Sequence, residues 1–187
     1  MEAKRLLRSR LLAARAARPR AEVAAAEVAL AAHGAAAWST LSRVAAFAGV
    51  GSEPPTHALL DRLSDAGVMV LLPVVAEAGL QWSSYDGWGG LVEGPLGLLE
   101  PAGSPATDDV LATVDVVLVP ALAVDPHGHR LGRGKGYYDR ALTDVEPARI
   151  VAAVYDDEVL DDVPAETHDR RVGFALTPSG LRRLGSD

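Results

Sequence analysis

The chain has 187 residues, of which 49% are hydrophobic, and no cysteine, so we expect one domain over residues 1–187 that needs no disulfide and uses no thiolate chemistry. Its formal charge of -7 argues against a general nucleic-acid binder, because affinity for the phosphate backbone depends on the number of phosphates neutralised. No strongly apolar run reaches about 18 residues, so we expect no membrane span and a cytoplasmic protein.

The N-terminal segment favours two helices. Helix-forming residues fill 3–18, and Pro19 precedes a second, alanine-rich helix over 20–32 that we expect to end at Gly34. Lys4 and Arg8 are four residues apart, so their side chains leave the same helix face and can converge on one anion. From the spacing alone, a solvated cationic face is the simpler interpretation.

Apolar runs alternate with helical segments through the rest of the chain. We expect strands over 43–50, 68–72, 114–119 and 149–154, and helices over 56–65, with Thr56 as N-cap, and over 137–142. This alternation predicts a three-layer α/β/α fold with a mostly parallel, Rossmann-like central sheet.

Two segments are less regular. Residues 81–104 combine Trp82, Tyr85 and Trp88 with many glycines, so we expect short antiparallel strands that line a ligand pocket. An ordinary surface excursion would have the same composition. Residues 178–184 predict a short tail helix on the outside of the domain.

The most informative segment lies between the strand at 114–119 and the helix at 137–142. Gly132, Gly134 and Gly136 alternate there with Arg133 and Lys135. Glycines let backbone N–H groups approach a phosphate, and the cationic side chains neutralise it. Because a helix begins directly after the loop, the arrangement predicts a site for a nucleotide or another phosphorylated ligand.

Two well-known phosphate-binding motifs do not fit this loop. A Walker loop ending at Lys135 requires glycine where His129 stands. A dinucleotide fingerprint beginning at Gly132 requires glycine where Tyr137 stands. A flexible turn with solvated arginines is the simplest alternative, but the loop concentrates positive charge in an acidic chain. His127 and His129 have no further histidine or cysteine beside them, so we interpret both as loop residues rather than metal ligands.

The loop also carries a family resemblance. The sequence LGRGKGYYDR at 131–140, after a hydrophobic strand and VPALAVDPHGHR, resembles the signature of the 5-formyltetrahydrofolate cyclo-ligases. Further similar segments are KRLLR at 4–8, FAGVGSEPPT at 47–56, LLEP at 98–101 and the pair His168-Asp169. The resemblance therefore spans nearly the whole chain.

This resemblance implies an enzyme that uses ATP and Mg²⁺. Such enzymes convert 5-formyltetrahydrofolate, with one or more glutamates on its tail, into 5,10-methenyltetrahydrofolate and release ADP and phosphate. The formyl oxygen attacks the γ-phosphate, and N10 of the folate then closes the ring. Catalysis of this kind consists mainly of positioning and charge neutralisation. We expect a monomer or weak homodimer without nucleic-acid or membrane partners.

The resemblance also implies roles for individual residues. Lys135 and Tyr137 would be catalytic, and Asp139 and Asp169 would bind Mg²⁺. The residues expected at ATP are Lys4, Arg8, Arg130, Gly132, Arg133, Gly134, Lys135, Gly136, Tyr137 and Tyr138. The residues expected at the folate are Ala48, Glu53, Arg133, Lys135 and Tyr137. The chain departs from the family pattern at Pro54-Pro55, which stiffen the turn after Glu53.

Two alternatives stay open at this point. A non-catalytic nucleotide- or RNA-binding module would explain the basic loop and the basic N-terminal helix, but it has little need of Asp139 and Asp169. An ATP-dependent ligase for another substrate would differ only in the second ligand. The basic, alanine-rich start is also typical of a transit peptide, but the match of Lys4 and Arg8 to the family favours mature structure.

Overall fold

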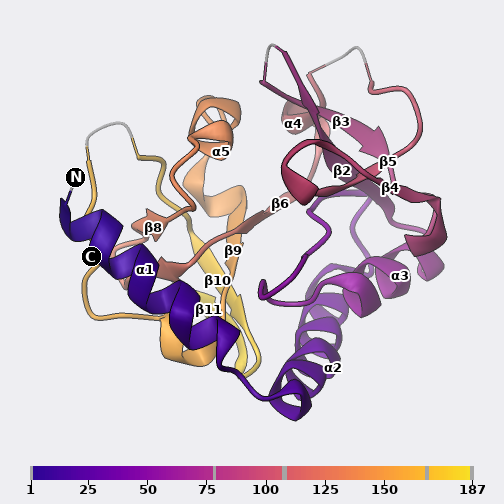
Figure 1. The fold of residues 1–187 in the computed structure, drawn as a ribbon. Coiled ribbons are helices and arrows are strands. Elements are labelled where there is room, and N and C mark those ends of the chain that lie inside the picture. The colour runs from indigo at the N-terminus through magenta and orange to yellow at the C-terminus, as the bar shows by residue number, and fades with distance from the viewer. Residues whose placement is uncertain (1, 78, 107–108, 167–168, 186–187) are drawn as a thin grey trace.

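A seven-stranded sheet forms the centre of the molecule in the computed structural model, which describes residues 2–77, 79–106, 109–166 and 169–185 (Figure 1). The strands, in their order across the sheet, are β11 (Gly180–Arg183), β10 (Phe174–Thr177), β9 (Ile150–Ala153), β6 (Val116–Pro120), β1 (Arg43–Ala45), β2 (Met69–Ala76) and β3 (Gly79–Ser84). The five inner strands are parallel, and β11 and β3 pair antiparallel at the two edges. This confirms the mostly parallel sheet predicted from the sequence.

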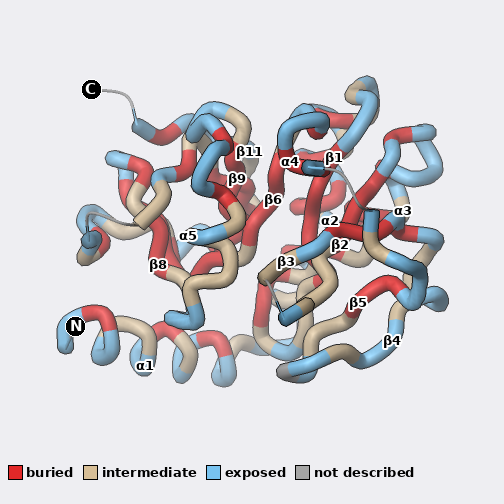
Figure 2. Tube along the Cα trace, turned by 90° about the horizontal axis from the view of Figure 1, so that it is seen from above, coloured by how far each residue is buried: buried red, intermediate tan, exposed pale blue. Residues whose placement is uncertain are grey.

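Helices cover both faces of the sheet. The helices α2 (Arg20–Trp38) and α3 (His57–Asp65) pack in one core with Leu118 of β6. Its neighbours Val117 and Val119 pack on the opposite face with α4 (Val110–Thr113) and α5 (Tyr137–Ala141). Figure 2 shows the resulting burial along the inner strands. Strands buried on both faces are continuously apolar, which is why the sequence revealed them.

Smaller elements complete the fold. The first helix, α1 (Glu2–Ala16), packs through Leu11 against Leu122, Leu131 and Val163. Beside it lies a hairpin that leads directly into the glycine loop (Figure 1). The remaining elements are β4 (Leu91–Glu93), β5 (Leu99–Pro101), β7 (Ala123–Val124), β8 (Arg130–Leu131) and the 3₁₀ turns η1 (Trp88–Gly90), η2 (Pro95–Gly97), η3 (Pro147–Arg149) and η4 (Asp156–Glu158). No helix in the described ranges is long and apolar enough to cross a bilayer.

Some predicted boundaries differ from the structure. The strand predicted over 43–50 ends at Ala45. Beyond it, the Thr56 hydroxyl donates to the Phe47 carbonyl and accepts from the Gly49 N–H. The hydroxyl therefore does not cap α3. The second helix continues through Gly34, where a Cβ would lie 2.6 Å from Leu59 Cδ1. Glycine serves close helix packing there, not helix termination.

The predicted tail helix over 178–184 is wrong. Residues Phe174–Thr177 and Gly180–Arg183 form an antiparallel hairpin that extends the sheet. Gly180 has a φ of 139°, which favours glycine and turns the chain back onto β10. By contrast, the short antiparallel strands expected within 81–104 are present as part of β3 and as the β4–β5 pair.

Candidate functional site

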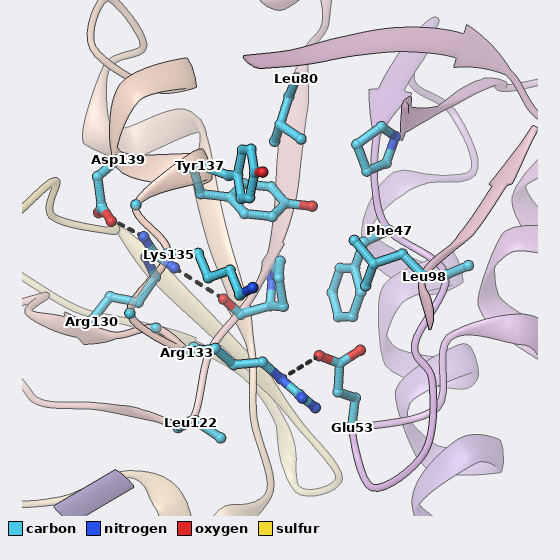
Figure 3. A pocket seen from close by; sticks show the side chains of 18 of the residues that line it. Phe47, Glu53, Leu80, Leu98, Leu122, Arg130, Arg133, Lys135, Tyr137 and Asp139 are labelled. Atoms are coloured by element: carbon cyan, nitrogen blue, oxygen red, sulfur yellow. Dashed lines mark hydrogen bonds and ion pairs between the residues drawn. The ribbon is translucent and has the colours of Figure 1, made fainter. Parts of the chain in front are cut away.

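A cavity of about 280 Å³ lies at the carboxyl ends of β1 and β6, where ligands bind in many parallel α/β folds (Figure 3). Phe47, Leu98 and Glu53 face it from one side, and the glycine loop faces it from the other. Leu80 of β3 contributes to the wall, and α5 contacts this strand. The cavity thus has an apolar wall opposite a cationic one.

Most of the residues predicted from the sequence line this cavity. They are Ala48, Glu53, Arg130, Gly132, Arg133, Gly134, Lys135, Gly136, Tyr137, Tyr138 and Asp139. Lys4, Arg8 and Asp169 are not among the lining residues. The structure therefore brings two distant segments, 48–53 and 130–139, to one site.

The conformation of the loop depends on its glycines. Gly134 and Gly136 have φ values of 95° and 68°, in the region that other residues rarely adopt. Gly136 immediately precedes α5. Arg8 Nε donates to the Gly132 carbonyl at 2.8 Å, and a Cβ on Gly134 would lie 3.3 Å from Arg8 Cζ. Arg8 therefore contacts the loop and stabilises its conformation without lining the cavity.

The three cations of the loop differ in their partners (Figure 3). Arg130, with a side chain 3% exposed, bonds Asp139 Oδ1 at 2.7 Å through Nη2. Arg133 Nε lies 3.0 Å from Glu53 Oε1. Lys135 is exposed and forms no ion pair with any residue that the structure describes. Its charge is therefore available to a ligand.

Tyr138 also lines the cavity. Burial raises the pKa of Tyr138, the negative charge of Glu53 raises it further, and Arg130 opposes the shift. Its phenol therefore stays protonated at neutral pH and can donate a hydrogen bond to a ligand oxygen.

The two predicted Mg²⁺ ligands belong to separate ion pairs. Asp139 is bonded to Arg130, whereas Asp169 Oδ2 accepts a 2.6 Å hydrogen bond from Lys4 Nζ. Lys4 also lies 3.5 Å from Glu166, so this lysine links α1 to the segment before β10. Across the described ranges, no group of three or more His, Cys, Asp or Glu side chains is arranged to hold a metal ion. His168 lies outside the described residues.

Sequence reasoning missed Arg15, which lines the cavity with a side chain only 1% exposed. Its guanidinium binds both oxygens of Glu158, at 2.6 and 2.7 Å, and Nη2 also donates to the Ala121 carbonyl at 2.6 Å. These contacts fix the end of α1 to the carboxyl end of β6. The spacing of Arg15 could have indicated this position, because Arg15 follows Lys4 and Arg8 on the same face of the helix.

Asp125 organises the turn that precedes the glycine loop. Its Oδ1 accepts the backbone N–H groups of His127 and His129, and its Oδ2 accepts that of Val163 and contacts His129 Nδ1 at 2.9 Å. Burial alone would raise the pKa of Asp125, but the hydrogen bonds from His129 and Val163 outweigh it and lower the pKa. The histidines thus belong to a structural turn, as the sequence indicated.

Replacing Asp125 with alanine is expected to lower the free energy of unfolding by about 3 kcal/mol, because buried N–H groups lose their acceptor. A lowered carboxyl pKa contributes stability above the ordinary Asp pKa that is lost as the pH falls through the folded value. The variant lacks this contribution, so its stability should fall less than that of the wild type between about pH 5 and pH 3. Urea unfolding at several pH values measures both effects, with the exposed Asp161→Ala as control. Equal stability of the two variants at pH 7 would contradict the assigned role.

Comparison with known proteins identifies the family. The model of the 5-formyltetrahydrofolate cyclo-ligase family matches residues 1–178. The chain belongs to this family. A 5-formyltetrahydrofolate cyclo-ligase of Mycolicibacterium smegmatis is 48% identical over 142 residues, which are 72% of this chain and 73% of that protein. The Escherichia coli cyclo-ligase is 31% identical over 73% of this chain and 78% of its own length.

A solved structure agrees with the cyclo-ligase assignment, and a second supports the fold. The 5,10-methenyltetrahydrofolate synthetase of Aquifex aeolicus superposes with a TM-score of 0.83 at 26% identity, covering 98% of this chain and 94% of that one. The synthetase from Mycoplasma pneumoniae, at 18% identity and a TM-score of 0.71, covers 92% of this chain and 97% of its own and supports the fold. The family, the fold and the enzyme class expected from the sequence are confirmed. A cyclo-ligase acts on a folate, which favours an enzyme over a nucleotide- or RNA-binding module.

Proposed function

We propose that this cyclo-ligase uses ATP and Mg²⁺ to convert 5-formyltetrahydrofolate into 5,10-methenyltetrahydrofolate, with release of ADP and phosphate. The observation that carries the proposal is the cavity itself, in which the glycine loop faces an apolar wall that ends at Glu53. Lys135 of this loop forms no ion pair within the part of the chain that the structure describes. One wall suits phosphates, and the other suits a flat, partly apolar ring system. We further propose a cytoplasmic monomer or weak homodimer. The charge of -7 supports the absence of nucleic-acid partners.

The loop residues fit the phosphates of a nucleotide. Gly134 and Gly136 leave the backbone open to close approach, and Lys135 and Arg133 supply positive charge at the cavity. Arg130 Nε, in β8 just before the loop, is buried and has no hydrogen-bond partner among the residues described, so an unsatisfied donor remains beside the loop. We therefore assign ATP to this wall.

The residues also fit a Mg²⁺ ion that phosphates hold in large part, because such an ion needs only one or two protein carboxylates. Asp139 supplies a carboxylate at the cavity that is 25% exposed. Asp169 is the proposed second carboxylate, and binding of the ion would replace its bond with Lys4, which would keep Glu166 as its neighbour at 3.5 Å. When bound, Mg²⁺ would neutralise phosphate charge.

The folate is proposed to lie against the apolar wall. Phe47, Leu80 and Leu98 offer it an apolar surface, with Ala48 beside them. Glu53 would accept hydrogen bonds from the N–H groups of the pterin ring. The Pro54-Pro55 turn is compatible with this role, because Glu53 still lines the cavity.

The proposed reaction balances without a side-chain nucleophile. The formyl oxygen forms a bond to the γ-phosphorus as the bond to ADP breaks, and N10 then attacks the formyl carbon. N10 loses its proton, and the formyl oxygen leaves with the phosphate. Lys135 would neutralise charge on the transferring group, and the Tyr137 hydroxyl would orient the formyl group between the two walls.

The test is the near-ultraviolet absorbance of methenyltetrahydrofolate. Purified protein is mixed with 5-formyltetrahydrofolate, ATP and Mg²⁺, and each component is omitted in turn. We expect signal in the complete mixture alone. Absence of signal from a chain that still binds ATP would point instead to a ligase for another substrate.

A further inference from the structure

Two charged residues from opposite walls of the cavity are bonded to each other. Arg133 Nε lies 3.0 Å from Glu53 Oε1 (Figure 3). Under the proposed function, Arg133 serves the phosphates and Glu53 serves the folate. Each of the two charges is therefore engaged by the other.

The two partners are not equally held. The Glu53 side chain is 5% exposed, and its second oxygen accepts the Val50 N–H at 3.1 Å within the same loop. The Arg133 side chain is 49% exposed and lies between Gly132 and Gly134. A ligand would thus displace Arg133 more easily than Glu53.

The other cavity cations do not share this property. Arg130 is buried and bonds both Asp139 and the Pro120 carbonyl. Arg15, which also lines the cavity, is buried and binds Glu158. Lys135 has no acidic partner within the described ranges. Arg133 is therefore the cation that combines an ion pair across the cavity with an exposed side chain.

We propose that the Arg133–Glu53 ion pair couples the binding of the two substrates. Phosphates that draw Arg133 towards them uncover Glu53 for the N–H groups of the folate ring. A folate that engages Glu53 likewise releases Arg133 for the phosphates. This inference rests on the proposed function, and such coupling must be equal in both directions.

If Glu53 only bound the folate, replacing it would leave nucleotide binding unchanged, whereas coupling through Arg133 predicts a change. Glu53→Gln removes the charge that competes for Arg133, so the variant should bind a nucleotide more tightly than the wild type. With adenylyl imidodiphosphate and Mg²⁺ as the probe, we expect about a fivefold lower Kd by isothermal titration calorimetry. The same variant should bind 5-formyltetrahydrofolate more weakly.

A double-mutant cycle separates this coupling from a general change in charge. In an Arg133→Met background, Glu53→Gln should leave the nucleotide Kd unchanged, because the competing partner is absent. Tightening that persists in this background, or no tightening in the single variant, would overturn the proposal. Thermal unfolding of each variant establishes that it is folded.

The Kd of the wild type for 5-formyltetrahydrofolate, measured with and without nucleotide, completes the test. Saturating adenylyl imidodiphosphate should lower the Kd for 5-formyltetrahydrofolate by about the same factor of five. If both ligands bind independently, the coupling is absent although the proposed function stands. If the wild type binds no nucleotide, both the coupling and the ATP-dependent function are wrong.

Discussion

Replacing Lys135 with methionine is expected to lower kcat by about 10²- to 10³-fold, with a smaller change in KM. Arg130 and Arg133 have carboxylate partners, whereas Lys135 has none among the described residues. Its charge is therefore free to stabilise the phosphoryl group during transfer, where fixed charges have their largest effect. Steady-state rates of methenyltetrahydrofolate formation at saturating ATP measure the loss.

The control for this variant is Arg140→Met. Arg140 lies outside the cavity lining, donates to the Lys135 carbonyl and stacks over the Tyr137 ring at 5.2 Å. Its loss disturbs the same loop without removing a cavity charge, so kcat should fall less than tenfold. A Lys135→Met variant that keeps half of the wild-type kcat would contradict the catalytic role.

Chemical labelling gives an independent check. Lysine occurs at only two positions in the chain, and Lys4 is buried and paired with Asp169. Among lysines, an acylating reagent should therefore modify the exposed Lys135 first. ATP with Mg²⁺ should slow this modification, as mass spectrometry of the peptides would show.

Replacing Asp139 with asparagine is expected to lower the turnover rate by about 100-fold at a fixed Mg²⁺ concentration. Asparagine keeps an oxygen that can accept from Arg130 Nη2, so the structural bond is retained. The negative charge that would attract Mg²⁺ is lost. Rates measured over a range of Mg²⁺ concentrations should show a higher requirement for the ion.

The matched control is Asp144→Asn, an exposed acid after the same helix. Its turnover and its Mg²⁺ requirement should equal those of the wild type. If Asp139→Asn also keeps the wild-type Mg²⁺ requirement, Asp139 is only the structural partner of Arg130, and the metal assignment is wrong.

The sequence predicted those parts of the fold that depend on residues close together along the chain. The strands around Leu118 and Val151 are buried on both faces, so each of them is a continuous apolar run in the sequence. The prediction of a tail helix over 178–184 was wrong because a four-residue strand and a short helix can have similar composition. Only the pairing of this segment with β10 decides between the two. The predicted helix end at Gly34 was wrong because the sequence does not distinguish a glycine that ends a helix from one that allows Leu59 to pack closely against the helix.

By itself, the sequence determined the parallel sheet, the glycine loop and the family, because each depends on residues that are neighbours along the chain or recur as a motif. The tertiary structure alone decided which charges meet. It bonded Arg133 to Glu53, Lys4 to Asp169 and Arg15 to Glu158, and it brought Phe47 and Leu80 to the cavity. The partners in these ion pairs come from segments that are distant along the chain. Their pairing depends on how the strands and helices pack, and the spacing of residues in the sequence does not reveal this packing.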